Sequence, residues 1–396
     1  MEQLAAAGGR PVRDDMLAYG KHWVDEQDIE AVVRVLRGDN LIQGPIVAEF
    51  ERAVAEKTGA KYAVAFSSGT AALHGAAYAA DIGPGDEAIT TPITFAATSN
   101  CVLYQGGTPV FADILDDTYN IDPYEIERNI TAKTKAILPV DYTGQPAEMD
   151  RVRMLADRHG LVVIQDAAHS LGATYAGQPV GSLAHMTMFS FHPVKHVTSV
   201  EGGIIVTDDE RYFRKLQAFR SHGITRGPDF MHSSDGPWYY EMQDLGFHYR
   251  MTDVHAALGM SQLSKLDAFI RRRLEIVSSY NEEFANLPGL VIPYQHPKAS
   301  SSWHLYMLRW KESEFSVGRR AIFEALRAEN IGVNVHYIPV YRMPYYRKLG
   351  YSEGLCPNAE AYYTEAITIP LFPRMTEHDV HDVVKAVKKV YAAFKK

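Results

Sequence analysis

The chain has 396 residues, of which 46% are hydrophobic and 22% charged, and its formal net charge is −8. A chain of this length can bury a large core, and it favours two domains over one. The acidic balance gives no electrostatic reason to bind nucleic acid or an anionic membrane surface. No run of about twenty apolar residues predicts a membrane span, so we expect neither nucleic-acid nor membrane partners.

The cysteines and the N-terminal segment argue against a disulfide, a metal site and a secretory signal. Cys101 and Cys356 lie far apart and match no metal-ligand spacing. This favours two buried free thiols in a reducing cytoplasm over a disulfide, and it predicts no metal site. Residues 1–15 are interrupted by glycines and a proline and lack a long apolar core. They do not read as a secretory signal, and we expect them to be loose.

The first half of the chain alternates helical patterns with short apolar runs. Residues 25–38 and 44–59 have apolar side chains at helical spacing, and each segment ends at a glycine. Between residues 62 and 208, short apolar runs are separated by helix-length segments. Several runs are apolar throughout, which is typical of strands covered on both faces. We therefore expect an α/β fold with a mostly parallel central sheet flanked by helices.

The pattern changes beyond Asp253. A long helix broken near its middle is followed by apparent strand, helix, strand and helix, the second strand at residues 333–341. This order predicts a smaller α+β domain, and we expect a large domain over residues 16–260 and a small C-terminal domain over residues 261–396. The aromatic, turn-rich segment 223–251 is long for a connection, and we expect a functional loop or a subunit contact there.

A small-residue turn joins the apolar run at residues 62–66 to a good helix former. Ser68, Gly69 and Thr70 lie in this turn. The first turn of a helix has unpaired N–H groups and the positive end of the dipole, so a phosphate fits there, and Gly69 allows close approach. An ordinary strand-to-helix turn with a serine cap is the alternative for this motif taken alone.

An acidic residue ends a later apolar run. Asp166 closes the run at residues 161–166, where a carboxylate in an open α/β sheet faces the ligand crevice. It could pair with a protonated pyridine nitrogen, Ala168 is small enough for a ring to lie on it, and His169 could hydrogen-bond a ring hydroxyl. A helix cap is the alternative for Asp166.

An aromatic residue, a serine and a lysine complete the pattern. Phe95 follows another strand and could stack on a ring, Ser190 could donate to phosphate, and Lys195 lies in the same turn as Ser190. Taken singly, Phe95 is more simply a core residue and Lys195 a solvated one. In this order, however, the groups are those needed to hold pyridoxal 5'-phosphate as a Schiff base on Lys195, with Asp166 as the second catalytic residue.

The sequence strongly resembles the DegT/DnrJ-type sugar aminotransferases, from about Tyr19 onward. The motifs that carry the resemblance include GPIVAEFE, SSGTAAL, GPGDEAI, DAAHSLGA, SFHPVKH and SHG. The resemblance implies the type I fold of pyridoxal phosphate enzymes, with pyridoxamine 5'-phosphate formed in turnover. It also implies a homodimer with active sites at the subunit interface, an amino donor, usually L-glutamate, and a nucleotide-linked keto-sugar as acceptor.

Two positions qualify this resemblance. Many relatives have asparagine where this chain has His248, and in those relatives the asparagine reaches across the dimer to the cofactor phosphate. Histidine can also donate to phosphate, so His248 could keep this role. Some relatives have histidine in place of Lys195 and act as dehydratases, so the lysine favours transamination.

Residues 333–341 resemble most the subgroup that aminates carbon 4 in the pseudaminic acid pathway. Its acceptor is UDP-2-acetamido-2,6-dideoxy-β-L-arabino-hexos-4-ulose, and the resemblance places His336 and Tyr337 near the sugar or its diphosphate. The alternative is that this segment is simply a strand. Related enzymes that make perosamine or 4-amino-arabinose, other type I pyridoxal phosphate enzymes, and a non-catalytic regulator on the same fold also stay open. A nicotinamide enzyme is disfavoured because no strand leads into a GxGxxG turn.

Overall fold

The computed structural model describes residues 2–227 and 230–396. A seven-stranded main sheet forms the centre of the molecule, with the strand order β1-β9-β8-β5-β4-β2-β3. Neighbouring strands from β8 to β3 are parallel, whereas β9 is antiparallel to both β1 and β8. The expected mostly parallel sheet is therefore confirmed. Its strands are β1 (Tyr62–Phe66), β2 (Glu87–Thr90), β3 (Thr108–Phe111), β4 (Thr134–Leu138), β5 (Val162–Asp166), β8 (Met186–Ser190) and β9 (Gly203–Thr207).

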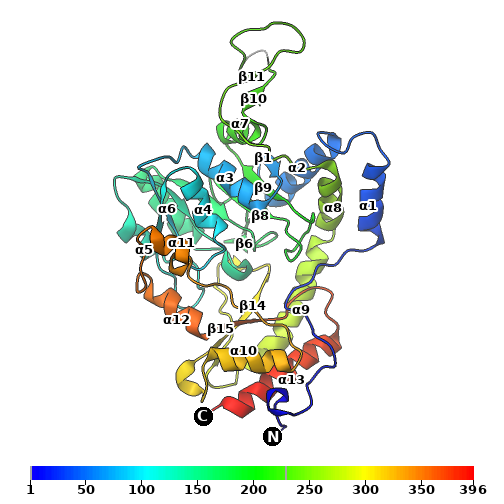
Figure 1. The fold of residues 1–396 in the computed structure, drawn as a ribbon, viewed down its shortest axis with the longest axis vertical. Helices are drawn as coiled ribbons and strands as arrows, with labels where there is room; N and C mark the ends of the chain where they lie inside the picture. Colours follow the sequence, from blue (N-terminus) through cyan, green and yellow to red (C-terminus); the bar gives the residue numbers. More distant parts are fainter. Residues whose placement is uncertain (1, 228–229) are drawn as a thin grey trace.

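Helices flank the main sheet (Figure 1), and their ends follow local sequence rules. The N-terminus of α1 is closed by a capping box between Asp25 and Asp28. Helix α2 begins with Pro45 and ends at Gly59 in the left-handed conformation. Both helices thus confirm the periodicity prediction. The helices of this part are α1 (Glu26–Leu36), α2 (Pro45–Thr58), α3 (Gly69–Ala79), α4 (Ala97–Tyr104), α5 (Pro123–Asn129), α6 (Met149–His159), α7 (Glu210–Phe219) and α8 (Asp253–Leu263).

A second unit is built on a small antiparallel sheet in the order β12-β14-β15. Its long helices α9, α10 and α13 pack around a core of their own, which includes Trp310 and Phe284. We call this part the small-sheet unit. It lies at the bottom of Figure 1, together with both termini. The predicted break in the long helix falls at Ser264 and Lys265. The elements are α9 (Leu266–Phe284), α10 (Arg319–Ala328), α12 (Pro357–Glu365), α13 (Glu377–Phe394), β12 (Leu290–Val291), β14 (Tyr306–Trp310) and β15 (Ala366–Ile369). The short helix α11 (Pro344–Lys348) packs instead against the main-sheet part, where the Tyr346 hydroxyl bonds Ser99 and Asn100 of α4.

Short elements complete the chain. A three-stranded sheet joins β13 (Ala299–Ser300), β6 (Thr174–Tyr175) and β7 (Gln178–Pro179). Cys101 and Cys356 are buried and unpaired, as expected. Across the described residues, no helix combines the length and apolar character needed to span a bilayer.

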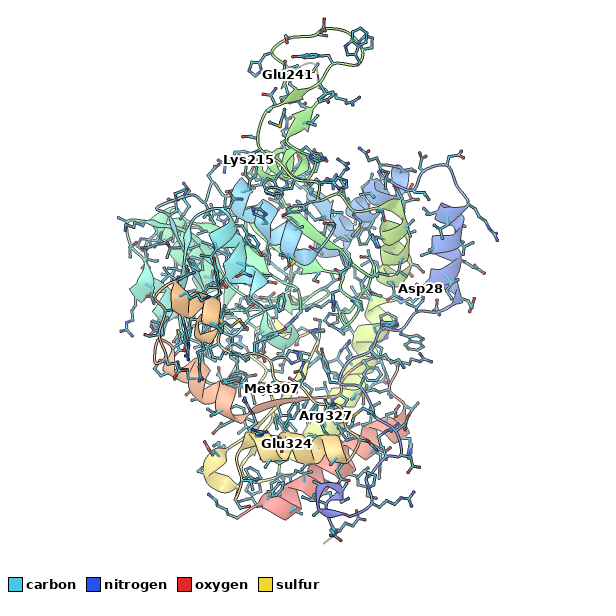
Figure 2. All side chains as sticks on the ribbon, viewed as in Figure 1. Asp28, Lys215, Glu241, Met307, Glu324 and Arg327 are labelled. Atoms are coloured by element: carbon cyan, nitrogen blue, oxygen red, sulfur yellow. The ribbon has the colours of Figure 1, made fainter. Side chains whose placement is uncertain are left out.

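A narrow arm projects from the main-sheet part, at the top of Figure 1. It is built on the two-stranded ribbon of β10 (Ile224–Thr225) and β11 (Glu241–Met242). The Glu241 carboxylate accepts hydrogen bonds from the backbone N–H groups of His232 and Ser233, which ties the arm together. Figure 2 shows its side chains, with Glu241 labelled, standing clear of the body.

Two sequence predictions are wrong. Residues 333–341 were expected to form a strand, but they form an irregular segment with a single bridge between Asn334 and Thr368. The hydroxyls of Tyr142 and Tyr362 donate to the carbonyl of His336, so side chains replace a strand partner there. The segment 1–15 was expected to be loose, but residues 2–15 are ordered along the small-sheet unit by hydrogen bonds to partners more than 300 residues away in the sequence. Met1 lies outside the described residues.

Candidate active site

A cavity of about 520 Å³ lies at the C-terminal ends of the main-sheet strands. This is where an open α/β sheet presents ligand-binding groups. All the site residues expected from the sequence line this cavity except His248. Residues from the small-sheet unit form part of its wall. The predicted residues that line it are Ser68, Gly69, Thr70, Phe95, Asp166, Ala168, His169, Ser190, Lys195, His336 and Tyr337.

The turn before α3 forms one end of the cavity. Ser68 is the N-cap of α3, and its hydroxyl accepts a hydrogen bond of 3.1 Å from the N–H of Ala71. The first-turn N–H groups of a helix have no acceptor within the helix, and the dipole is positive at this end. Together with the Ser190 hydroxyl, this end has the donors that a phosphate dianion requires.

A glycine in β9 allows this turn to pack against the sheet. A Cβ atom at Gly203 would lie 2.6 Å from the Cα and N atoms of Gly69 and from the carbonyl oxygen of Ser68. Real Cβ contacts are not so short, and all three atoms belong to the backbone. Gly203 is therefore a packing requirement of the turn at residues 68–70, which we call the phosphate turn after its predicted ligand, although Gly203 does not itself line the cavity.

We expect Gly203→Ala to destabilise the protein by about 1–3 kcal/mol because the added methyl group must displace the turn. It should also weaken phosphate-dependent cofactor binding more than it weakens binding of a cofactor analogue without phosphate. Urea unfolding and cofactor titration measure the two effects. Gly83→Ala is the matched control, since the nearest atom to its Cβ lies 3.9 Å away. Equal stability of the two variants would contradict the assignment.

Asp166 ends β5 and is buried beside the cavity. Its Oδ2 accepts a hydrogen bond of 2.7 Å from the Thr98 hydroxyl, and its Oδ1 accepts one of 3.1 Å from the N–H of Ala168. Burial raises the pKa of Asp166, while these donors and Lys195 act in the opposite direction. A carboxylate in this setting is stabilised by a cationic N–H group placed next to it.

Lys195 is half-buried in the turn after β8, where its backbone N–H donates to the His192 carbonyl. Burial lowers the pKa of Lys195 to about 8, although Asp166 acts to raise it. At pH 7 roughly a tenth of such amines are neutral, against far fewer for a solvated lysine. Lys195 is therefore suited to act as a nucleophile and to exchange protons.

Phe95 is the exposed aromatic residue of the cavity. Its side chain is 65% exposed although it lines the cavity together with Ala168. The ring lies just before α4, and the Phe95 carbonyl accepts a hydrogen bond from the N–H of Thr98. The sequence left core packing open for Phe95, and the structure excludes it. An uncovered ring facing a cavity offers a surface on which a flat ligand can stack.

His169 and Tyr337 meet inside the cavity. The His169 Nε2 atom lies 3.3 Å from the Tyr337 hydroxyl, and the buried His169 Nδ1 has no hydrogen-bond partner among the described residues. Burial holds the pKa of His169 well below its usual value, so the ring is neutral. A Tyr337 hydroxyl that donates to Nε2 leaves the ring proton on Nδ1, free to bond a ligand oxygen.

These observations fit pyridoxal phosphate. One end has phosphate donors, and the lining includes the uncovered Phe95 ring and the small residue Ala168. Among the described residues, the buried Asp166 carboxylate accepts hydrogen bonds from two neutral donors and can still pair with a pyridinium nitrogen, and His169 Nδ1 has no partner, so it can serve a ring hydroxyl. Of the two residues assigned to the sugar, His336 is buried and bonded through Nδ1 to the Thr368 hydroxyl at 2.8 Å.

The structure adds residues that sequence patterns did not indicate. Thr98 holds Asp166 from a different segment of the chain, and Tyr19 and His304 line the cavity. No local signal marks Thr98, because a threonine near a helix start is common. His248 lies exposed near the base of the arm, with its ring stacked on His222 at 5.6 Å. Its place in a neighbouring subunit's site, which the family resemblance implies, stays a prediction.

Comparison with known proteins gives the family. The chain is 42% identical over 380 residues to the spore coat polysaccharide biosynthesis protein SpsC of Bacillus subtilis (strain 168), which covers 96% of this chain and 98% of that protein. Its fold is similar to that of Helicobacter pylori PseC, an aminotransferase involved in the biosynthesis of pseudoaminic acid, with 34% identity, a TM-score of 0.89, and 96% and 100% of the two chains covered.

A further solved structure is Spr1654 of Streptococcus pneumoniae, assigned as a sugar aminotransferase and determined in its PMP form. The identity is 31%, the TM-score 0.90, and the match covers 95% of this chain and 99% of that one. Residues 23–388 match the DegT/DnrJ/EryC1/StrS aminotransferase family. With the cavity geometry, this match shows that the chain is an enzyme belonging to the DegT/DnrJ/EryC1/StrS aminotransferase family.

Proposed function

We propose that this enzyme is a pyridoxal phosphate-dependent sugar aminotransferase that moves an amino group from L-glutamate to carbon 4 of a UDP-linked 6-deoxy keto-sugar. The acceptor we propose is UDP-2-acetamido-2,6-dideoxy-β-L-arabino-hexos-4-ulose. The observation that carries the proposal is the grouping of Lys195, Asp166 and the phosphate turn in one cavity. The similarity to PseC over almost the whole of both chains supports the choice of acceptor.

Each group in the cavity has a definite task in this chemistry. When bound, pyridoxal phosphate supplies an electron sink through its ring. Ser68, Gly69, Thr70 and Ser190 hold the phosphate, and Phe95 and Ala168 hold the two faces of the ring. Asp166 keeps a proton on the ring nitrogen, and His169 donates to the ring hydroxyl.

Lys195 is the group that moves protons. Its lowered pKa would let the amine accept a proton from the α-carbon of the donor and return a proton to the carbon on the other side of the amino nitrogen. Another part of the cavity wall comes from the small-sheet unit and includes His336, Tyr337 and Ile338. We assign the acceptor sugar to this wall, since it is the part of the cavity that the cofactor groups leave free.

The choice of acceptor is tested with the pyridoxamine form of the purified enzyme. It is mixed in turn with keto-sugar nucleotides of the pseudaminic acid, perosamine and 4-amino-arabinose types, and with simple keto acids, while the return of the aldehyde absorbance is followed. We expect the UDP-linked 6-deoxy keto-sugar to react fastest among the sugars, and 2-oxoglutarate to react among the keto acids. A faster reaction with another sugar would replace the acceptor, and no reaction with any sugar would overturn the proposal.

We further propose that two copies of the chain share their active sites. The arm carries large apolar side chains that the single chain leaves uncovered, among them Trp238 at 69% and Leu245 at 75% exposure. Apolar surface of this kind is usual where a second chain packs. His248 lies near the base of the same arm and outside the cavity of its own chain, so we assign it to the phosphate of the neighbouring copy.

Mixed dimers test this assignment. We expect His248→Ala alone to weaken cofactor binding about tenfold, the loss of one charge-assisted hydrogen bond. The His248→Ala and Lys195→Ala chains are then combined at a cofactor concentration too low to saturate the His248→Ala protein. A shared site collects both defects in one cavity and leaves the other native, so the mixture should be more active than the average of the two variants. A mixture no more active than that average, together with a monomeric mass in light scattering, would contradict the shared site.

A further inference from the structure

Residues 2–20, which we call the strap, lie outside the segment that matches the family and are fastened to the small-sheet unit. The backbone N–H groups of Ala5 and Val12 donate to the buried Glu329 carboxylate at 2.9 and 3.0 Å. Lys389 pairs with the same carboxylate at 2.8 Å, and both partners are almost fully buried. A buried carboxylate paired with a buried lysine is a fixed anchor, because separating the two would leave charges unpaired in the interior.

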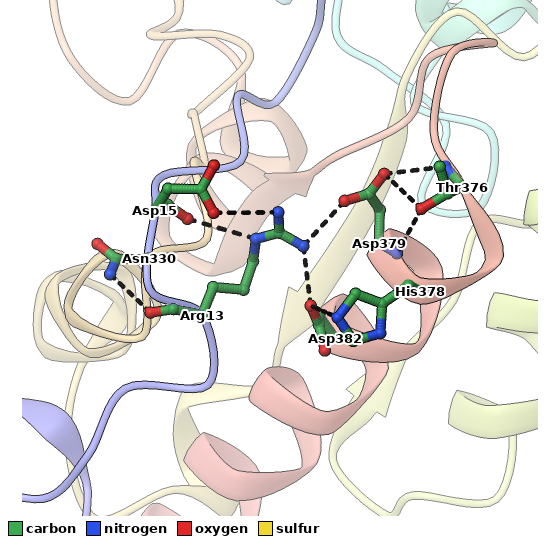
Figure 3. Close-up of polar contacts among 7 residues, drawn as sticks. All are labelled: Arg13, Asp15, Asn330, Thr376, His378, Asp379 and Asp382. Atoms are coloured by element: carbon green, nitrogen blue, oxygen red, sulfur yellow. Dashed lines mark hydrogen bonds and ion pairs between the residues drawn. The ribbon is translucent and has the colours of Figure 1, made fainter.

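A second anchor lies at Arg13 (Figure 3). Its Nη1 atom donates to Asp379 at 2.9 Å and to Asp382 at 2.8 Å, both on α13. The Arg13 carbonyl accepts a hydrogen bond of 2.8 Å from the Asn330 side chain. The Arg13 side chain is only 12% exposed, so this cluster holds the strap more firmly than a solvated ion pair would.

Beyond the anchors the strap is held by backbone contacts as it crosses to the cavity. Leu17 forms a parallel bridge with Ile331, and its carbonyl accepts a hydrogen bond of 2.7 Å from the N–H of Gly332. A Cβ atom at Gly332 would lie 2.5 Å from that carbonyl oxygen, so this approach requires glycine. The Tyr19 carbonyl then accepts a hydrogen bond of 3.1 Å from the N–H of Leu371.

Tyr19 is the residue that the strap delivers to the cavity. Its side chain lines the cavity, with its ring centroid 5.5 Å from that of His336. The Tyr19 hydroxyl has no hydrogen-bond partner among the described residues, in contrast to the engaged hydroxyls of Tyr142, Tyr337 and Tyr362. A flat ring with a free hydroxyl is complementary to a sugar, which presents C–H faces and hydroxyl or phosphate oxygens.

We propose that Tyr19 is a recognition residue for the acceptor sugar, and that the strap exists to hold it against His336. This inference rests on the proposed function and deepens it. L-Glutamate is much smaller than a nucleotide-linked sugar, so it can react at Lys195 without filling the cavity out to the wall that Tyr19 shares with the small-sheet unit. The nucleotide-linked acceptor must extend to that wall. The contribution of Tyr19 to kcat/KM should therefore be larger for the acceptor than for the donor.

The test separates the two half-reactions by stopped-flow absorbance. Tyr19→Phe should lower kcat/KM for the keto-sugar about fivefold, the equivalent of one ordinary hydrogen bond, and Tyr19→Ala about tenfold or more. The donor half-reaction with L-glutamate should lose less than twofold in both variants. Equal losses in both half-reactions, or no loss in either, would overturn the assignment.

The strap itself is tested through its anchor. Arg13→Ala should raise hydrogen exchange over residues 2–20 and lower kcat/KM for the keto-sugar by a smaller factor than Tyr19→Ala. Arg320→Ala is the matched control, because that arginine is 91% exposed on α10 of the same unit and should change neither quantity. Faster exchange in the Arg13 variant with unchanged use of the sugar would show that the strap only stabilises the fold.

These outcomes are distinct from a failure of the proposed function. A wild-type enzyme that reacts with a different nucleotide sugar still allows the same ratio of half-reactions to be measured with that sugar. A wild-type enzyme that reacts with no nucleotide sugar overturns both proposals, whereas an active wild type with unaffected Tyr19 variants overturns only this one.

Discussion

Lys195→Ala is expected to lower turnover by at least about 10⁴-fold, the upper range of what a positioned acid–base group contributes. The reason is that no other amine lines the cavity among the described residues, so no side chain can replace Lys195 in moving the proton. The variant should still bind pyridoxamine phosphate, since the phosphate turn, Phe95 and Asp166 remain. The measurements are steady-state transamination and a cofactor titration.

Borohydride trapping followed by peptide mapping gives an independent check on Lys195. The label should lie on the peptide that contains Lys195 in the wild type and should be lost in the variant. Lys298→Ala is the matched control, because that lysine is 54% exposed and pairs only with Asp150 at the surface. Near-normal turnover in the Lys195 variant, or a label on another lysine, would refute the assignment.

Asp166→Asn is expected to lower turnover on the order of 10³-fold, as removal of a preorganised charge at a reacting group does. Asparagine keeps the shape of the side chain. Its oxygen can still accept from Ala168, and its amide can donate to the Thr98 hydroxyl, whose proton then turns to the Phe95 carbonyl at 3.2 Å. What is lost is the negative charge that keeps the ring nitrogen protonated. Turnover near that of the wild type would mean that another group carries this role.

The same substitution has the opposite effect on the stability of the cofactor-free protein. Burial raises the folded-state pKa of Asp166, so the folded state binds the proton more tightly than the unfolded state. Stability therefore falls as the pH rises through these pKa values, and asparagine removes this dependence. At pH 7 the melting temperature of the cofactor-free Asp166→Asn variant should be at least as high as that of the wild type. At acidic pH the difference between the two melting temperatures should be smaller. Marked destabilisation at pH 7 would indicate that the loss of activity reflects misfolding.

The helices and strands were largely predictable because their signals are local. The capping residue Asp25, Pro45 at the start of α2 and Gly59 at its end act within a few residues of their own positions. The strands around Asp166 are apolar at successive positions, so both faces of each strand are apolar. This pattern already indicated a mostly parallel sheet that is covered on both faces. The ends of parallel strands meet at one edge, so the order of motifs was enough to predict which side chains would share a cavity.

The irregular segment at residues 333–341 was not predictable in the same way. Its alternation is that of a strand, but the hydroxyls of Tyr142 and Tyr362 hold the His336 carbonyl. The antiparallel orientation of β9 was equally unpredictable, since the apolar pattern of a strand does not indicate in which direction the strand runs in the sheet. These features depend on partners that are distant in the sequence, and a local pattern carries no information about them.

The sequence by itself was enough to predict the candidate chemistry, from a lysine, an acid and a small-residue turn in the order of the strands, and with them the kind of fold that brings these residues together. Only the tertiary structure decided how that chemistry is supported and bounded. It set Thr98 on Asp166 and Gly203 against the phosphate turn. It also fastened residues 2–15, which the sequence predicted to be loose, to the small-sheet unit, and it placed Tyr19 in the cavity wall. Arg13 and Tyr19 gain these contacts from residues 336–382, which only folding places beside them.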